Sequence, residues 1–295
     1  MSAVSAAEHR EPVRTWRSVL AEVTGLVGSA SDAKWIVEEA AGYAGADLVR
    51  RLDEPVSARC GAHLARMVER RLAGEPVQYV LGRWGFRSLD LMVDSRVLIP
   101  RPETEQVVEW ALEAARRLER DELVVADLGT GSGAIALSLA QELRRAVVWA
   151  TDVSADALDV ARANTAGIGM WAATRVRLAE GSWWDALPAE LRGLLDVVVS
   201  NPPYVADGEV VEPEVEAWEP RLALRAGSDG LDAVREVVAG APAWLRPGGV
   251  LVVEIAPSQA DAARALASAA GASEVEVRRD ALGRDRALVS WWRRG

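Results

Sequence analysis

Cysteine, histidine and lysine are nearly missing from this sequence of 295 residues, and their scarcity removes several kinds of site. Cys60 is the only cysteine, which excludes an intrachain disulfide and a cysteine-rich zinc site. His9 and His63 are the only histidines, so we expect neither a histidine-ligated metal nor a Ser-His-Asp triad. We therefore predict no metal site, and we interpret Lys34, the only lysine, as a coding bias.

The sequence also lacks an apolar run long enough to span a membrane, and its first residues lack a signal-peptide core. The formal net charge is -10, which opposes a general nucleic-acid-binding surface because such a surface needs excess cations. Half of the residues are hydrophobic, enough for one large or two ordinary folded domains. We expect a cytoplasmic protein that binds neither membranes nor, directly, nucleic acid.

The first third of the chain changes its pattern twice. Apolar residues at three- and four-residue spacing between residues 13 and 72 predict about four short helices, one of them starting at Ser31-Asp32. Gly74-Glu75-Pro76 interrupts this pattern, and residues 77–99 then read as an extended hairpin. We expect a helical bundle domain over residues 1–75, a β-hairpin connector over 76–100 and a third domain over 101–295, whose first helix starts at Pro102 or Thr104.

Expected strands and helices alternate after residue 122. The strands are expected at 123–127, 146–151, 175–178, 194–200, 250–255, 274–278 and 286–292. The helices between them are expected at 134–143, 154–164, 232–244 and 258–269. Repeated strand-helix units predict an α/β fold with a Rossmann-like, mostly parallel sheet covered on both faces. No helix separates the last two strands, so we expect them to form an antiparallel pair at the edge of the sheet.

A glycine-rich loop lies between the first of these strands and its helix. Gly129, Gly131 and Gly133 let the backbone turn tightly and approach a ligand closely, and the helix start adds N–H donors beside Thr130 and Ser132. Asp152 ends the next strand, where a carboxylate can bind both hydroxyls of a ribose. Together these residues indicate a cofactor that contains a nucleoside.

Two details of this loop bear on which cofactor it holds. Its spacing is G-x-G-x-G, whereas dinucleotide folds have G-x-G-x-x-G. Asp127 precedes the loop, where a carboxylate would repel a pyrophosphate but could accept a hydrogen bond from an ammonium group. Both details favour S-adenosylmethionine over NAD.

The tetrapeptide Asn201-Pro202-Pro203-Tyr204 directly follows an apolar strand pattern. Proline fixes φ and lacks a donor, so the backbone there is rigid and its carbonyls stay free. The Asn201 side-chain oxygen and the Pro202 carbonyl can then both face one planar NH2 group, with the Tyr204 ring packed against it. A proline-rich turn after an edge strand would explain the tetrapeptide without any chemistry. The glycine loop at the end of a neighbouring strand favours a site that acts on an amide or amino nitrogen.

These motifs together resemble the PrmC/HemK family of methyltransferases. The resemblance covers nearly the whole chain: Gly74 to Tyr79 with Gly82, Leu98 to Glu105, Asp127 to Gly133, Asp152, Asn201 to Tyr204, and Glu219-Pro220 with Ala223-Leu224. The tetrapeptide alone is shared with adenine N6 methyltransferases, whereas Pro100 to Glu105 and the helical domain are particular to this family.

The resemblance implies a class I methyltransferase sheet and transfer of a methyl group from S-adenosylmethionine to the glutamine N5 in the Gly-Gly-Gln motif of class I release factors. It implies that the glycine loop holds the methionine part, Asp152 the ribose and Trp183 the adenine. It also implies that Asn201, Pro202 and Tyr204 are catalytic and bind the glutamine with Pro203, and that Asn201 belongs to the cofactor-binding residues as well. The helical domain is expected to dock the release factor. Two positions depart from the family: Ser182 replaces an acidic residue expected to bind the adenine amino group, and Trp218 replaces a phenylalanine.

Three other functions are compatible with the same residues. One is glutamine methylation of a ribosomal protein, which only the helical domain and connector argue against. A second is adenine N6 methylation, opposed by the acidic charge balance and by the lack of an evident target-recognition domain. The third is a catalytically silent protein that binds release factors or ribosomes. The intact Asn201 and Tyr204 argue against it, and failure to bind S-adenosylmethionine would support it.

Overall fold

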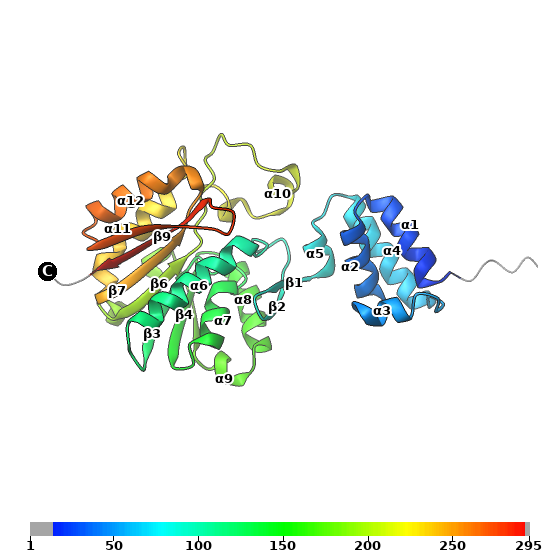
Figure 1. Cartoon of the computed structure of the whole chain (residues 1–295), viewed down its shortest axis with the longest axis horizontal. Coiled ribbons are helices and arrows are strands. Elements are labelled where there is room, and N and C mark those ends of the chain that lie inside the picture. Colours follow the sequence, from blue (N-terminus) through cyan, green and yellow to red (C-terminus); the bar gives the residue numbers. More distant parts are fainter. Residues whose placement is uncertain (1–13, 293–295) are drawn as a thin grey trace, which may run out of the picture. The chain divides into compact units, whose positions relative to one another are not determined.

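The computed structural model describes residues 14–292, which form two compact units that divide between Leu81 and Gly82 (Figure 1). His9, one of the two histidines considered above, lies outside the described residues. Within residues 14–292, no helix combines the length and the apolar character needed to cross a membrane.

The first unit is made of helices packed around one apolar core. Its helices are α1 (Trp16–Val27), α2 (Ala30–Ala41), α3 (Ala46–Arg50), α4 (Ala58–Leu72) and α5 (Val77–Leu81). Apolar residues at helical spacing, such as Trp16, Val19 and Val23 of α1, provide the buried side chains of the core. The predicted helical bundle is confirmed.

Two details of this unit differ from the expectations. Helix α2 begins at Ala30, not after Ser31-Asp32, because the Ser29 hydroxyl caps it by accepting the N–H of Asp32 at 3.3 Å. Residues 77–81 are helical, not extended. Pro76 precedes this last turn, and Val77 and Val80 point into the helical core, so burial decides the local structure there.

The second unit starts with a hairpin and continues as a seven-stranded sheet. The hairpin joins β1 (Arg83–Phe86) to β2 (Leu89–Met92). The strands of the sheet are β3 (Leu123–Leu128), β4 (Ala146–Asp152), β5 (Val176–Glu180), β6 (Leu195–Ser200), β7 (Leu245–Glu254), β8 (Glu274–Arg279) and β9 (Asp285–Trp292). Its helices are α6 (Pro102–Arg117), α7 (Ala134–Glu142), α8 (Ala155–Gly167), α9 (Met170–Ala173), α10 (Pro213–Trp218), α11 (Asp232–Trp244) and α12 (Ala260–Ala269).

The strand order is β5-β4-β3-β6-β7-β9-β8. Strand β9 runs in the direction opposite to the other six strands, so it is antiparallel to both β7 and β8. The mostly parallel sheet with an antiparallel last strand is therefore confirmed. Strand β9 is inserted between β7 and β8, so the antiparallel pair lies at one edge of the sheet as expected. Strands β3 and β6, which precede the two sequence motifs, are adjacent. Their carboxyl ends bring the glycine loop and the tetrapeptide to the same edge.

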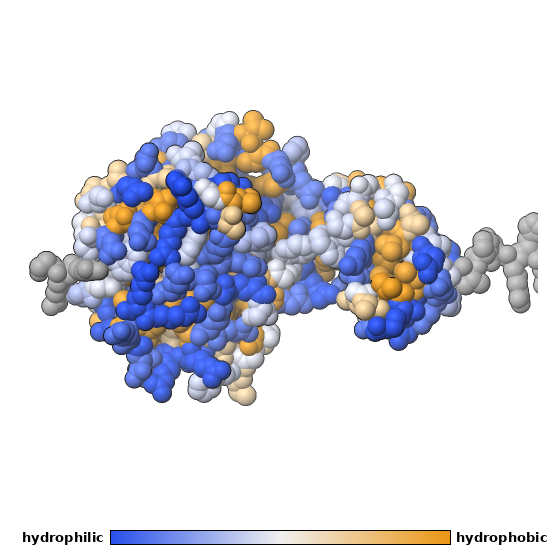
Figure 2. Space-filling model, viewed as in Figure 1, coloured by the Kyte–Doolittle hydropathy of each residue, from blue (hydrophilic) through white to orange (hydrophobic). Residues whose placement is uncertain are grey.

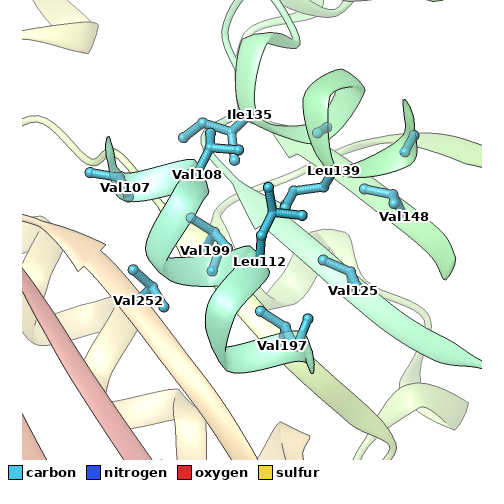
Figure 3. Packing of buried hydrophobic residues seen from close by; sticks show 14 of the residues in the cluster. Val107, Val108, Leu112, Val125, Ile135, Leu139, Val148, Val197, Val199 and Val252 are labelled. Carbon is cyan, nitrogen blue, oxygen red and sulfur yellow. The ribbon is translucent and has the colours of Figure 1, made fainter. Parts of the chain in front are cut away.

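Helices cover both faces of this sheet. Figure 3 shows Val107, Val108 and Leu112 of α6 and two residues of α7 packed on valines from the strands. The alternate residues of the same strands, such as Val198 and Leu251, face the opposite core beneath α11 and α12. The central strands β3 and β6 are almost entirely buried because the sheet is covered on both faces, which explains their continuous apolar runs in the sequence. The edge strands β5 and β8 are mostly half-buried or exposed.

Candidate active site

A cavity of about 670 Å³ opens at the carboxyl ends of β3, β4 and β6, within the second unit. Its walls are the glycine loop, the end of β4, the segment around Trp183, the tetrapeptide and the connection that follows it. Residues 95–98 and Pro100, just before α6, close another side. This is the place where doubly wound sheets bind ligands.

Most of the predicted site residues line this cavity. These are Gly129, Thr130, Gly131, Ser132, Asp152, Trp183, Asn201 and Pro203. Gly133, Pro202 and Tyr204 are not among the lining residues. Gly133 instead starts α7 with φ of 87°, and a side chain there would meet Leu137 at 3.1 Å. Its role in the structure is to let the loop turn into the helix.

The glycine loop is held in a conformation that a ligand can approach closely. Gly129 and Gly131 have φ of 77° and 54°, which favours glycine at both positions. A Cβ on Gly131 would meet no atom within 4 Å, so its backbone faces open space, whereas a Cβ on Gly129 would lie 3.5 Å from the Trp183 ring. The Asp127 carboxylate fastens the loop from beneath by accepting the Thr130 hydroxyl at 2.6 Å and the Ala136 N–H at 3.1 Å.

Asp127 is completely buried, and it is not one of the residues that line the cavity. Its Oδ1 accepts no hydrogen bond among the described residues. Burial, opposed by the two hydrogen bonds and supported by the nearby Asp152 charge, raises the pKa of Asp127 to about 7. The expectation that Asp127 could accept a hydrogen bond from an ammonium group stays a prediction. Its observed hydrogen bonds, from Thr130 and Ala136, stabilise the conformation of the loop.

Asp152 lies at the end of β4 and lines the cavity. One carboxylate oxygen accepts the Gly131 N–H at 2.9 Å and the other accepts the Ser154 N–H at 2.9 Å. Each oxygen keeps a further lone pair for a ligand hydroxyl. Burial raises the pKa of Asp152, although these backbone donors act against that shift.

Trp183 lies across from the glycine loop and carries strain in its backbone. Its φ is 45°, in the left-handed region that non-glycine residues rarely adopt. Gly181, two residues earlier, has φ of 156°, and a Cβ there would come within 2.8 Å of Ala186. Such outliers cost about 1–3 kcal/mol and cluster at ligand sites. Ser182 lines the same cavity, as do the carboxylate residues Asp156, Asp232 and Glu236.

The open glycine backbone, the strained aromatic residue and the carboxylate at the end of β4 fit the parts of S-adenosylmethionine. The cavity offers a backbone cradle for a small charged group, a ring for a purine and a dihydroxyl acceptor. Within residues 14–292, no three histidine, cysteine, aspartate or glutamate side chains are arranged to hold a metal ion.

The tetrapeptide is fixed by contacts behind the cavity. Asn201 donates its Nδ2 hydrogen to the Thr104 hydroxyl at 3.2 Å, and the Tyr204 carbonyl accepts from Gln259 at 3.0 Å. Pro202 is buried and Tyr204 is half-buried. Burial and the nearby Glu254 charge raise the pKa of the Tyr204 hydroxyl, so it stays protonated.

Two residues behind the tetrapeptide were not predicted as part of the site. The sequence indicates Thr104 as a possible helix start and as part of the segment Pro100 to Glu105 that resembles the family, without a role in the site. It indicates Glu254 only as part of an expected strand. Thr104 lines the cavity, and its hydroxyl donates to the buried Glu254 carboxylate at 2.7 Å. The signal that could have found Glu254 is its position as a lone carboxylate at the end of an apolar strand.

Two family models match separate parts of the chain. Residues 11–82 match the family described as PrmC N-terminal domain, and residues 112–217 match the methyltransferase small domain. The chain is similar to the release factor glutamine methyltransferase of Xylella fastidiosa strain 9a5c, with 47% identity over 80% of this chain and 84% of that protein. The enzyme of the same name from Burkholderia pseudomallei is 44% identical over 88% and 90% of the two chains, and that from Gloeobacter violaceus is 39% identical over 97% and 99%.

Among solved structures, most of the chain shares its fold with more distant methyltransferases. A methyltransferase from Pyrococcus furiosus matches with a TM-score of 0.52 and 18% identity, covering 78% of this chain and all of that one. The catalytic domain of hMettl16 in complex with the MAT2A 3'UTR hairpin 6 matches with a TM-score of 0.53 and 14% identity, covering 79% and 81%. At these identities the likeness shows the fold alone.

Proposed function

The chain belongs to the release factor glutamine methyltransferase family, and we propose that it transfers a methyl group from S-adenosylmethionine to a glutamine side chain of class I release factors in the cytoplasm. The acceptor atom is N5 of the glutamine in their Gly-Gly-Gln motif, as the resemblance to the PrmC/HemK family implies. The observation that carries this proposal is that the cofactor motif and the acceptor motif meet at the same cavity. The glycine loop with Asp152 and the amide-binding tetrapeptide lie at the ends of adjacent parallel strands.

For the cofactor, the proposal assigns the glycine loop to the methionine part, the Asp152 carboxylate to the ribose and Trp183 to the adenine. When bound, S-adenosylmethionine supplies an electrophilic methyl group on a sulfonium. The protein's part is to hold that group in the cavity without distorting the loop. Asp152 supports this because it binds the Gly131 N–H while keeping lone pairs for hydroxyl groups.

For the acceptor, the proposal assigns Asn201 and Pro202 to the two N–H groups of the glutamine amide. An amide nitrogen is a weak nucleophile because its lone pair is delocalised into the carbonyl. Two fixed oxygens that hold both hydrogens direct the nitrogen toward the methyl group, and such alignment is worth several kcal/mol. The same oxygens stabilise the positive charge that develops as the nitrogen gains the methyl group and before it loses one proton to water. Tyr204 packs beside this amide, and no strong base is needed.

For the protein substrate, exposed apolar side chains lie in the connection that follows the tetrapeptide. Leu222 lines the cavity and is 62% exposed, and Val210 in the same connection is 94% exposed. Figure 2 shows apolar surface over the loop that precedes α10. We assign this loop to contact with the release factor around the acceptor glutamine. The helical unit docks a second part of the same protein.

The proposal is tested by giving labelled S-adenosylmethionine to the purified protein with three acceptors in parallel. These are a release factor, ribosomal proteins, and DNA or RNA rich in adenine. Label in the release factor alone is the expected result. Label in ribosomal protein or nucleic acid would overturn the choice of substrate. Failure to bind the cofactor in a calorimetric titration would overturn the assignment as an enzyme.

A further inference from the structure

A chain of two hydrogen bonds runs from the tetrapeptide into the protein interior. Asn201 follows β6, Thr104 lies in the first turn of α6, and Glu254 is the last residue of β7. The Asn201 Nδ2 donates to the Thr104 Oγ1 at 3.2 Å, and this hydroxyl donates to the Glu254 Oε2 at 2.7 Å. Thr104 is 4% exposed and Glu254 is 1% exposed, so the bond between them is buried. The bond between Asn201 and Thr104 is partly buried in the wall of the cavity.

The buried Glu254 carboxylate sets the donor-to-acceptor direction of both hydrogen bonds. An ionised carboxylate only accepts hydrogen bonds, so the single hydroxyl proton of Thr104 must point to Glu254. The Thr104 oxygen can then only accept from Asn201, which must present its NH2 group. The opposite atom of the same planar amide is Oδ1. Because Asn201 also lines the cavity, this arrangement leaves Oδ1 as its acceptor for a ligand.

We propose that Thr104 and Glu254 are positioning residues that orient the Asn201 side-chain amide. A proton on Glu254 allows this amide to flip, so that its Oδ1 and its NH2 group exchange places. The inference rests on the proposed function, in which Asn201 Oδ1 accepts from the glutamine NH2. A protonated Glu254 can donate to Thr104, which can then donate to Asn201 Oδ1. The amide would turn its NH2 toward the cavity, where it repels the NH2 of the acceptor glutamine.

The surroundings of Glu254 place this proton exchange near neutral pH. Burial raises the pKa of Glu254 to about 7, while the Thr104 hydroxyl, the Arg286 charge and Tyr204 lower it and Glu103 raises it. Arg286 acts on Glu254 through its charge, and its guanidinium donates to Asp280 at 3.4 Å. The Oε1 of Glu254 accepts no hydrogen bond among the described residues, which leaves a site for the proton. Activity should therefore fall as the pH drops below about 7.

A direct test needs neither cofactor nor release factor. The Asn201 side-chain NH2 is observed by nitrogen-15 NMR in asparagine-labelled protein and assigned with Asn201→Ala. Its signals should move with an apparent pKa near 7 in the wild type and stay constant between about pH 6 and 8 in Glu254→Gln. A wild-type signal that does not titrate, or titration that persists in Glu254→Gln, would overturn the proposal. This readout stands even if methyl transfer to the release factor is not observed.

The kinetic test separates positioning from a general structural role. Thr104→Val should lower kcat for release factor about tenfold to a hundredfold, as misplaced reacting groups do, with unchanged affinity for S-adenosylmethionine. Thr104→Ser keeps the hydroxyl and should restore kcat and the acid limb of the pH profile. Asp196→Asn, which removes a buried carboxylate from the other end of β6, should keep the acid limb. Wild-type kcat with a wild-type pH profile in Thr104→Val would contradict the proposal.

Discussion

The backbone N–H of Gly131 donates to the Asp152 carboxylate at 2.9 Å, and this bond joins the glycine loop to the end of β4. This bond fixes the loop relative to the carboxylate, although 21 positions separate the two residues in the sequence. A ligand that binds Asp152 also meets the loop in a fixed conformation, which reduces the entropy lost on binding.

We expect Gly131→Ala to weaken S-adenosylmethionine binding and to lower stability less than Gly133→Ala does. Its Cβ would meet no protein atom, so the cost is the left-handed φ and the intrusion into the cavity. Calorimetry should show an affinity at least about tenfold lower, or about 1.4 kcal/mol. Gly133→Ala is the matched control: its Cβ would press on Leu137, so it should lower the melting temperature more than Gly131→Ala does. Equal affinity losses with equal stability losses would contradict this division of roles.

Asn201→Ala should reduce turnover much more than cofactor affinity. The variant loses the oxygen that holds the acceptor amide, and removing one such preorganised group costs about a hundredfold to a thousandfold in kcat. The affinity for S-adenosylmethionine, measured without release factor, should stay within about twofold of wild type. A comparable loss in both quantities would mean that Asn201 serves the cofactor and not the acceptor.

The buried Asp127 should make the protein less stable as the pH rises toward neutrality. Its pKa is about 7 when folded and near 3.9 when unfolded, so the folded state binds more protons between these values. The stabilisation is complete below about pH 4, is lost as the pH passes through about 7, and amounts to a few kcal/mol.

Melting temperatures of wild type and Asp127→Asn between about pH 5 and 8 test this sign. The melting temperature of the wild type should exceed that of Asp127→Asn by a difference that decreases as the pH increases. Asp229→Asn is the control: Arg235 lowers the pKa of that exposed carboxyl, so its contribution is already constant above about pH 5. A wild-type advantage over Asp127→Asn that stays constant or widens would show that Asp127 is not protonated in the folded protein.

The sequence predicts the sheet well because each strand and helix carries a local signal. The apolar runs before Asp127, Asp152 and Asn201 identify three strands, and the polar residues at their ends identify the ligand-binding edge. The short helix α5 was missed because five residues carry too little periodicity, and its burial depends on partners elsewhere in the first unit.

Local patterns could not predict the contacts behind the tetrapeptide. Thr104 is 97 positions from Asn201 and 150 from Glu254, and the parallel register that pairs Ser200 with Val253 brings their ends together. The sequence also gave no reason to separate Gly133 from the other two glycines of the loop. The structure separates them by their surroundings, since only Gly133 packs against Leu137.

The central claim is tested most directly by methyl transfer from labelled S-adenosylmethionine to a purified release factor, beside a Gln→Ala variant of its Gly-Gly-Gln motif. The account predicts label on the first protein and none on the second. Equal label on both proteins would contradict the assignment of the acceptor glutamine. No label on either, with the cofactor bound, would contradict the release factor as substrate.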